Sequence, residues 1–123
     1  MPGRVTVSRE LAALFGVLSN PHRVRLIEEL REDEKDVNGL QTALGISHSG
    51  VSQHLALLRA HRLVTERREG RHVYYRLSQP KLAQWIVEGL DFIHGELMQE
   101  EAIRAAVEQA RVLWAPAEAA TER

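Results

Sequence analysis

Residues 36–61 hold two short amphipathic segments separated by a glycine, and this spacing most strongly constrains the fold. Leu40 and Leu44 recur at helical spacing after Asp36. Gly45 can adopt the left-handed conformation that ends a helix at little cost. Ser47 is a suitable N-cap for a second helix over residues 47–61. Segments of these lengths around such a turn are typical of a helix-turn-helix motif.

The flanking residues predict further elements. Helical spacing of Leu11 and Leu14 predicts a first helix over 8–19 with Ser8 as its N-cap, and "NP" at 20–21 opens a second helix. "LVTERREGRHVYYRL" predicts a β-hairpin with Gly70 in its turn. Helical spacing then continues from Pro80 to residue 97. The predicted fold is mainly α with a small β-hairpin, in the order α-α-α-α-β-β-α of a winged helix-turn-helix.

Length and composition restrict the class of protein. The 123 residues suit one small domain, which we place at 8–114, with an N-terminal arm at 1–7 and a flexible tail at 115–123. No apolar run approaches the roughly 20 residues that span a bilayer, so we expect no membrane partner. The N-terminus lacks the apolar stretch of a secretory signal, which favours the cytoplasm. The absence of cysteine excludes disulfides and thiolate metal sites.

Helix geometry divides the side chains of 47–61 between two faces. At about 100° per residue, Val51, Leu55 and Leu58 form a narrow apolar stripe that faces the core. The opposite face carries Ser49, Ser52, Gln53 and Ala56. These side chains are uncharged and mostly short, and the base edges in the major groove of DNA exchange hydrogen bonds with such groups. A plain solvated face is the alternative interpretation.

Three histidines lie in this segment, but their spacing does not suit a metal site. His54 and His61 lie along the edge of the apolar stripe, two helical turns or about 10 Å apart, too far for one metal ion to bridge. We interpret both as half-buried packing residues. His48, in the first turn, is either simply exposed or able to reach a phosphate or a base edge.

Positive charge is concentrated next to this helix. The whole chain has a net charge of −1, but residues 47–79 carry six arginines against Glu66 and Glu69. Three of these arginines lie at or beside the hairpin tip: Arg67, Arg68 and Arg71. Arginines there can bind backbone phosphates, which gives affinity without sequence information. A solvated hairpin is the alternative.

Three segments resemble the ArsR/SmtB winged-helix repressors of bacteria, over roughly residues 8–98. "LSNPHRVRLIEEL" is similar to the opening of the family's second helix, "LGISHSGVSQHLALLR" to its recognition helix and "EGRHVYYRL" to its wing. The resemblance implies a homodimer, joined by its first and last helices, that represses from a pseudo-palindromic operator in double-stranded DNA until an effector releases it. By position it assigns Ser49, Ser52 and Gln53 to bases and Arg67, Arg68 and Arg71 to phosphates. The effector is unknown.

The chain departs from the family's metal sensors. "DVNGL" stands where those sensors have Cys-x-Cys in the third helix. For the zinc and nickel site of the family's last helix, Asp91, His94 and Glu108 are available, but no histidine follows position 94. One imidazole per chain binds transition metals weakly. We therefore expect no cofactor, and a metal-responsive repressor is the alternative.

The exit of the recognition helix is a second departure. Arg62 stands where the family has glycine. If Arg62 adopts a positive φ, this costs about 1 kcal/mol, so we expect the connection from this helix to the first strand to differ slightly from the family's.

The apolar surface of the last helical segment predicts self-association. A three-helix core of this size covers only part of it, and two-fold pairing with a second copy covers the rest. The expected dimer interface comprises Trp85, Ile86, Leu90, Ile93 and Leu97 of this segment, together with Leu11 and Leu14 of the first helix, which the family resemblance implies. Two-fold symmetry then places two recognition helices about 34 Å apart, one turn of B-DNA.

Two other classes of protein fit the sequence less well. A winged helix that binds protein needs apolar residues on the exposed face of 47–61, where Ser49, Ser52 and Gln53 stand. An enzyme needs a nucleophile–base pair, a phosphate loop or converging carboxylates, and the sequence shows none. The sequence therefore predicts a non-enzymatic, DNA-binding transcriptional regulator.

Overall fold

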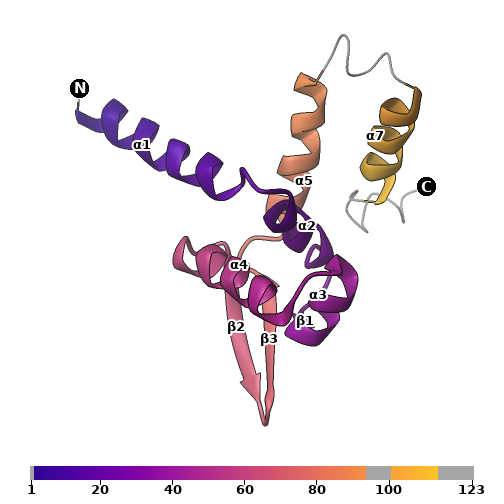
Figure 1. Ribbon diagram of the computed structural model, residues 1–123. Coiled ribbons are helices and arrows are strands. Elements are labelled where there is room, and N and C mark those ends of the chain that lie inside the picture. Colours follow the sequence, from indigo (N-terminus) through magenta and orange to yellow (C-terminus); the bar gives the residue numbers. More distant parts are fainter. Residues whose placement is uncertain (1, 94–100, 114–123) are drawn as a thin grey trace. The chain divides into compact units, whose positions relative to one another are not determined.

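The computed structural model describes residues 2–93 and 101–113, which fall into two units, 1–79 and 80–123. The first unit holds α1 (Pro2–Val17), α2 (Pro21–Glu29), β1 (Lys35–Asp36), α3 (Val37–Leu44), α4 (His48–Ala60), β2 (Val64–Glu69) and β3 (His72–Leu77) (Figure 1). The second holds α5 (Lys81–Glu88), the 3₁₀ helix η1 (Gly89–Phe92) and α7 (Glu101–Leu113). This confirms a mainly helical chain with a β-hairpin after the helix-turn-helix.

Side-chain caps determine where the three short helices of the first unit begin. Oδ1 of Asn20 accepts hydrogen bonds from the backbone N–H groups two and three residues later, at 2.8 and 3.3 Å. Oδ1 of Asp36 and Oγ of Ser47 each accept one from the N–H three residues later, at 2.8 and 3.0 Å. These bonds satisfy N–H groups that have no partner within the helix. The caps predicted at Asn20 and Ser47 are confirmed.

The first helix begins earlier than predicted. α1 starts at Pro2 rather than at Ser8, and the Ser8 hydroxyl donates to the carbonyl oxygen of Arg4 at 2.9 Å. Ser8 therefore lies inside the helix, and its predicted role as N-cap is wrong. The predicted limits of the arm, the domain and the tail stay predictions, and residues 115–123 lie outside the described part of the chain.

The predicted continuous helix after Pro80 is also wrong. α5 ends at Glu88, the chain tightens into η1, and Ile93 has an extended backbone with φ −98° and ψ 93°. Gly89 stands at the transition and has a low helix propensity. The sequence pattern missed the end of α5 because apolar spacing continues through these residues. Such spacing does not distinguish an α-helix from a short 3₁₀ turn.

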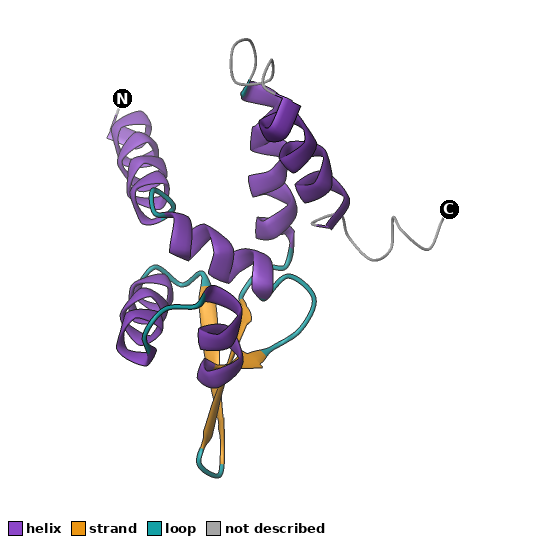
Figure 2. Cartoon of the chain, turned by 45° about the vertical axis from the view of Figure 1, so that its right-hand side comes forward, coloured by secondary structure: helices purple, strands orange, loops and turns teal. Residues whose placement is uncertain are grey.

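The strands form one antiparallel sheet in the order β1-β3-β2. Val64 pairs with Leu77 at the base of the hairpin and Glu69 with His72 near its tip, and Gly70 in the turn has a φ of 61°. β1 was not predicted, because two residues are too few to show an alternating pattern. The hairpin of β2 and β3 extends beyond the helices of its unit (Figure 2).

The core of the first unit lies where α2, α3 and α4 meet the base of the sheet. Its most buried side chains, each less than 2% exposed, are Leu26, Ile27, Leu40, Val51, Leu55, Leu58 and Val64. They come from three helices and one strand, so burying them fixes α4 against its neighbours. Among the described residues, no helix combines the length and apolar character needed to cross a membrane.

Candidate nucleic-acid interface

α4 separates its two faces as the sequence predicts. Val51, Leu55 and Leu58 are fully buried. On the opposite side Ser49, Gln53 and Ala56 are exposed and Ser52 is half-buried, while His48 is exposed at the first residue of the helix. The exposed side therefore offers short hydroxyl and amide groups without a charge. Their predicted contacts with bases stay a prediction.

The exit from α4 shows why Arg62 has an unusual backbone. Arg62 has a φ of 62°. Its N–H donates to the Arg59 carbonyl at 2.9 Å, and the N–H of Leu63 donates to the Leu58 carbonyl at 2.9 Å. This pair of bonds is a Schellman motif, which requires a left-handed residue after the cap. The connection leads directly into β2, so it sets how the hairpin leaves the helix.

An ion pair attaches the hairpin to α4. Nη1 of Arg59, in the last turn of α4, lies 3.0 Å from Oε1 of Glu66 in β2. The Tyr75 hydroxyl of β3 donates to Oε2 of the same glutamate at 3.3 Å. Burial and the Glu66 carboxylate raise the pKa of the Tyr75 hydroxyl. Glu66 thus links α4 to both strands of the hairpin.

A second attachment involves Arg67, which the sequence assigned to phosphate. Its guanidinium contacts both carboxylate oxygens of Glu34, at 2.6 and 3.2 Å, and Oε2 of Glu69 at 2.5 Å. It also lies 4.7 Å from the centre of the Tyr74 ring. The hydrogen bonds from Arg67 hold the pKa of Glu34 below its usual value. Glu34 had no signal in the sequence, since it lies 33 residues from its partner.

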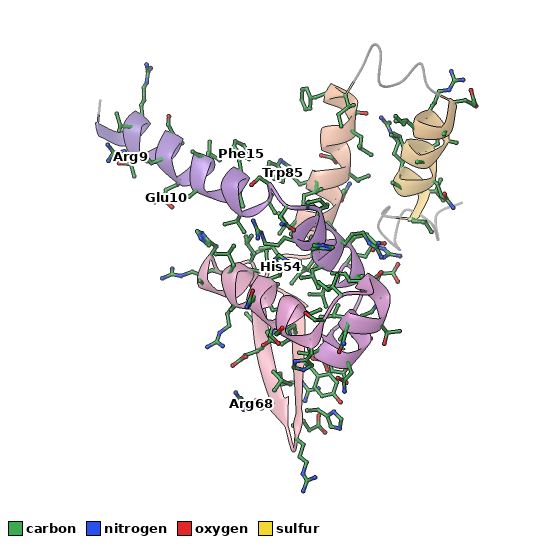
Figure 3. The ribbon with its side chains drawn as sticks, in the orientation of Figure 1. Arg9, Glu10, Phe15, His54, Arg68 and Trp85 are labelled. Carbon is green, nitrogen blue, oxygen red and sulfur yellow. The ribbon has the colours of Figure 1, made fainter. Side chains whose placement is uncertain are left out.

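The remaining arginines of this region keep their charge available. Arg62, Arg68, Arg71 and Arg76 form no ion pair with a carboxylate within the described ranges. Arg68 projects outward from β2 (Figure 3), and Arg71 lies exposed in the turn after Gly70. A flexible, exposed guanidinium can bind a phosphate without first breaking a salt bridge. Contact of Arg68 and Arg71 with phosphate stays a prediction.

The two histidines expected to pack behave differently. His54 is half-buried, and its Nδ1 lies 3.3 Å from Nη1 of Arg23 in α2. Burial, Arg23 and His22 together lower the pKa of His54. His61 is instead exposed at the C-cap of α4, so its predicted half-burial is wrong. The Arg23–His54 contact was missed because it joins residues 31 positions apart.

Known proteins are similar to this chain in both sequence and fold. Residues 20–66 match the bacterial regulatory protein, arsR family. The nodulation protein NolR of Rhizobium meliloti is 36% identical over 88 residues, which cover 71% of each chain. The chain belongs to the ArsR family. This confirms the resemblance inferred from the sequence.

A second relative of this ArsR-family chain matches a shorter part of it. A transcriptional repressor SmtB homolog of Synechocystis sp. is 42% identical over 71 residues, 58% of this chain and 54% of the relative. The chain thus spans about half the length of that relative.

Solved structures confirm the winged helix-turn-helix fold of this ArsR-family chain. The crystal structure of NolR from Sinorhizobium fredii is 32% identical, with a TM-score of 0.67 over 77% of this chain and 94% of that one. A homodimeric winged helix-turn-helix DNA-binding domain, Mb0332 from Mycobacterium bovis, is 27% identical, with a TM-score of 0.65 over 76% and 88%.

One of the three candidate metal ligands of this ArsR-family chain lies outside the described residues, so the alternative metal site stays a prediction. Oδ1 of Asp91 in η1 lies 2.7 Å from Nη2 of Arg111 in α7, and Glu108 is exposed in α7. His94 lies outside the described residues. Within the described ranges, no three histidine, aspartate or glutamate side chains are grouped as a metal site would require. The positive charge beside Asp91 disfavours a cation there.

The predicted dimer residues lie on separate elements. Leu11 is 46% exposed in α1, where Leu14 is half-buried, and Trp85 is 46% exposed in α5. Ile86, Leu90 and Ile93 are half-buried in α5, in η1 and just after it. Leu97 lies outside the described residues. The interface therefore stays a prediction for this member of the family.

Proposed function

We propose that this ArsR-family chain is a transcriptional repressor that binds a pseudo-palindromic DNA operator as a homodimer, with α4 in the major groove. The observation that carries the proposal is the uncharged exposed face of α4 next to a hairpin with unpaired arginines. Ser49, Ser52 and Gln53 supply hydrogen-bonding groups for base edges. Arg68 and Arg71 supply charge for the phosphate backbone.

The attachments of the hairpin support this geometry. The Arg59–Glu66 ion pair fixes β2 to α4, and the Schellman turn at Arg62 fixes the direction of the connection. A helix and a wing held in this way reach the groove and the flanking backbone together. Fixed geometry reduces the entropy that is lost on binding.

Pairing of two copies completes the proposed function. One helix and one wing offer few phosphate contacts, whereas two copies double them and define a half-site spacing of about 34 Å. Leu11 of α1 is 46% exposed, so it offers an apolar contact for a second copy. The SmtB homolog of Synechocystis sp. is named a transcriptional repressor, and Mb0332 is named a homodimeric winged helix-turn-helix DNA-binding domain. Both names agree with this proposal. We expect the chain to act in the cytoplasm, where bacterial DNA lies, and without enzymatic activity.

The exposed face of α4 suits protein binding less well than DNA binding. The exposed face of α4 has one large apolar side chain, Leu57, which is 36% exposed. A stable protein interface needs a buried apolar centre, and the serines and the glutamine on the rest of the face do not provide one.

Selection of duplex DNA from a random pool, followed by sequencing, tests the proposal. We expect enrichment of an inverted repeat whose half-sites are one helical turn apart. Repeating the selection with added zinc or nickel tests the metal-responsive alternative, in which the metal abolishes the enrichment. A pool that stays random under all conditions contradicts sequence-specific binding.

A further inference from the structure

Arg23 of α2 bonds to two other helices at once. Its Nε donates to the carbonyl oxygen of Val17, the last residue of α1, at 2.5 Å. Its Nη1 lies 3.3 Å from Nδ1 of His54 in α4. Asn20 caps α2 one turn earlier and bonds to the N–H of Arg23, which fixes where this side chain starts. One guanidinium therefore joins the end of α1 to the middle of α4.

The chemistry of this contact requires a neutral histidine. A guanidinium has only N–H donors, so Nδ1 of His54 must be the acceptor and the ring proton must lie on Nε2. A protonated imidazole carries a proton on both nitrogens. Protonation of His54 would therefore place two donors and two positive charges against each other at 3.3 Å.

The surroundings of His54 do not compensate for a positive charge. The charged and titratable groups that act on its ring are Arg23 and His22, both in α2. The centres of the His22 and His54 rings lie 5.6 Å apart. Val17 contributes only its carbonyl oxygen, which Arg23 already occupies. Burial and these two neighbours lower the pKa of His54 below its usual 6.5.

We propose that Arg23 and neutral His54 position the recognition helix α4 relative to α1, and that protonation of His54 releases this constraint and weakens DNA binding. The inference rests on the proposed function, because α1 there contributes to the dimer interface and α4 reads the operator. His54 directly follows Gln53 on α4. In a two-fold symmetric dimer, a change in the angle between α1 and α4 would move the two recognition helices α4 in opposite directions.

The direction of the pH effect follows from the lowered pKa. Unfolded chains bind the proton at a pKa near 6.5, whereas the folded chain binds it only at lower pH. The contribution of the pair to stability is therefore complete above pH 6.5. It decreases as the pH falls from 6.5 to the folded-state pKa and is constant below that value. Operator affinity depends on protonation of the folded chain, so it should decrease as the pH falls through the lowered folded-state pKa.

The first experiment measures affinity for the duplex enriched from the random pool between pH 7.5 and 4.5, for the wild type, His54→Gln and His61→Gln. The glutamine Oε1 can accept the hydrogen bond from Arg23 and does not titrate. Comparing ratios of affinities cancels the pH effects that the variants share with the wild type. Between these pH values, we expect the wild type to lose about three- to tenfold in affinity relative to His54→Gln.

The control separates His54 from histidines in general. His61 lies at the C-cap of the same helix and is exposed, so His61→Gln should follow the wild type. A wild-type to His54→Gln ratio that stays constant across the range overturns the inference. If no duplex is enriched, the proposed function fails, and the next experiment still tests the pair without DNA.

The second experiment uses the DNA-free protein and nuclear magnetic resonance of the histidine nitrogens. At pH 7.5 we expect the wild-type His54 to carry its proton on Nε2, and the Arg23→Gln variant to titrate His54 closer to 6.5. The tautomer is read in the wild type alone, so it does not depend on whether a variant folds. A proton on Nδ1 at pH 7.5, or a His54 pKa at or above 6.5 in the wild type, overturns the inference.

Discussion

The guanidinium of Arg67 donates two hydrogen bonds to the carboxylate of Glu34, from Nη2 to Oε1 at 2.6 Å and from Nε to Oε2 at 3.2 Å. Glu34 directly precedes β1, whereas Arg67 lies in β2 on the far side of β3. The two-pronged contact therefore ties the hairpin to the segment between α2 and α3. A guanidinium held by two carboxylates is less available to a phosphate than the unpaired ones of Arg68 and Arg71.

Arg67 and Arg68 should consequently have different effects on DNA binding. We expect Arg68→Ala to weaken binding to all sequences and to reduce the slope of log affinity against log salt by about 0.9, the value for one lost phosphate contact. Arg67→Ala should leave the slope closer to that of the wild type and return the pKa of Glu34 towards 4.5. Fluorescence anisotropy across a salt series measures the slopes, and nuclear magnetic resonance measures the carboxyl titration.

The two variants serve as controls for each other, since they remove the same side chain from adjacent positions of β2. Equal losses of slope would make Arg67 a phosphate contact, as the family resemblance implies. A wild-type slope for Arg68→Ala would contradict the assignment of Arg68.

Gln53 should determine part of the sequence preference. It is exposed on α4, and a glutamine amide can form two hydrogen bonds with adenine in the major groove. Gln53→Ala should therefore reduce discrimination at one position of each half-site by about 1–3 kcal/mol while leaving the salt slope unchanged. Sequencing of selected pools measures the preference at each position.

The matched control for this change is Gln79→Ala, which removes an exposed glutamine that lies outside α4. It should reproduce the wild-type preference. An unaltered preference for Gln53→Ala would show that the amide does not contact a base.

The features that could be predicted from the sequence are those whose cause lies within a few neighbouring residues. Ser47 caps the helix that follows it, Gly45 and Gly70 have positive φ, and Val51, Leu55 and Leu58 recur on one face. Each of these depends on local backbone geometry or on periodicity. From these features follow the exposed face of α4, opposite the apolar stripe, and the place of the hairpin in the sequence.

The features that were missed depend on residues far apart in the chain. Arg67 meets Glu34 and Arg23 meets His54 only because the sheet and the helices bring them together. No periodic pattern indicates such pairs. The start of α1 was missed for a different reason, because a serine hydroxyl can cap a helix or bond back to a carbonyl within one.

Leu11 should contribute to self-association. It is exposed on α1, in line with Leu14 and Leu18 at helical spacing. Leu11→Glu would place a charge in the proposed interface, and burying an unpaired charge is costly. We expect the dimer to dissociate at least tenfold more readily and operator affinity to fall with it, as measured by light scattering and anisotropy.

A charge of the same sign elsewhere on α1 provides the control. Ala13 is exposed and lies more than a third of a turn from the Leu11 side of the helix. Ala13→Glu should therefore leave the dimer intact. Similar dissociation for both variants would indicate a general effect of charge on α1 and would contradict an interface at Leu11.

The backbone at Arg62 stores strain that a glycine should relieve. Its φ of 62° lies in the left-handed region, which disfavours a side chain, and the Schellman bonds at the end of α4 hold it there. Its side chain is exposed and forms no ion pair with the described residues. Arg62→Gly should therefore raise the free energy of unfolding by about 0.5–1 kcal/mol, after allowing for the greater freedom of glycine in the unfolded chain.

Two further substitutions separate backbone strain from loss of the side chain. Arg62→Ala removes the guanidinium but keeps the strain, so its stability should stay near that of the wild type. Gly45→Ala introduces the same strain at a φ of 69°, where no atom within 4 Å would meet the new methyl group. We expect Gly45→Ala to lower the free energy of unfolding by about 1 kcal/mol. Urea denaturation measures all three, and equal stability of the glycine and alanine variants at position 62 would show that the left-handed backbone there carries no cost.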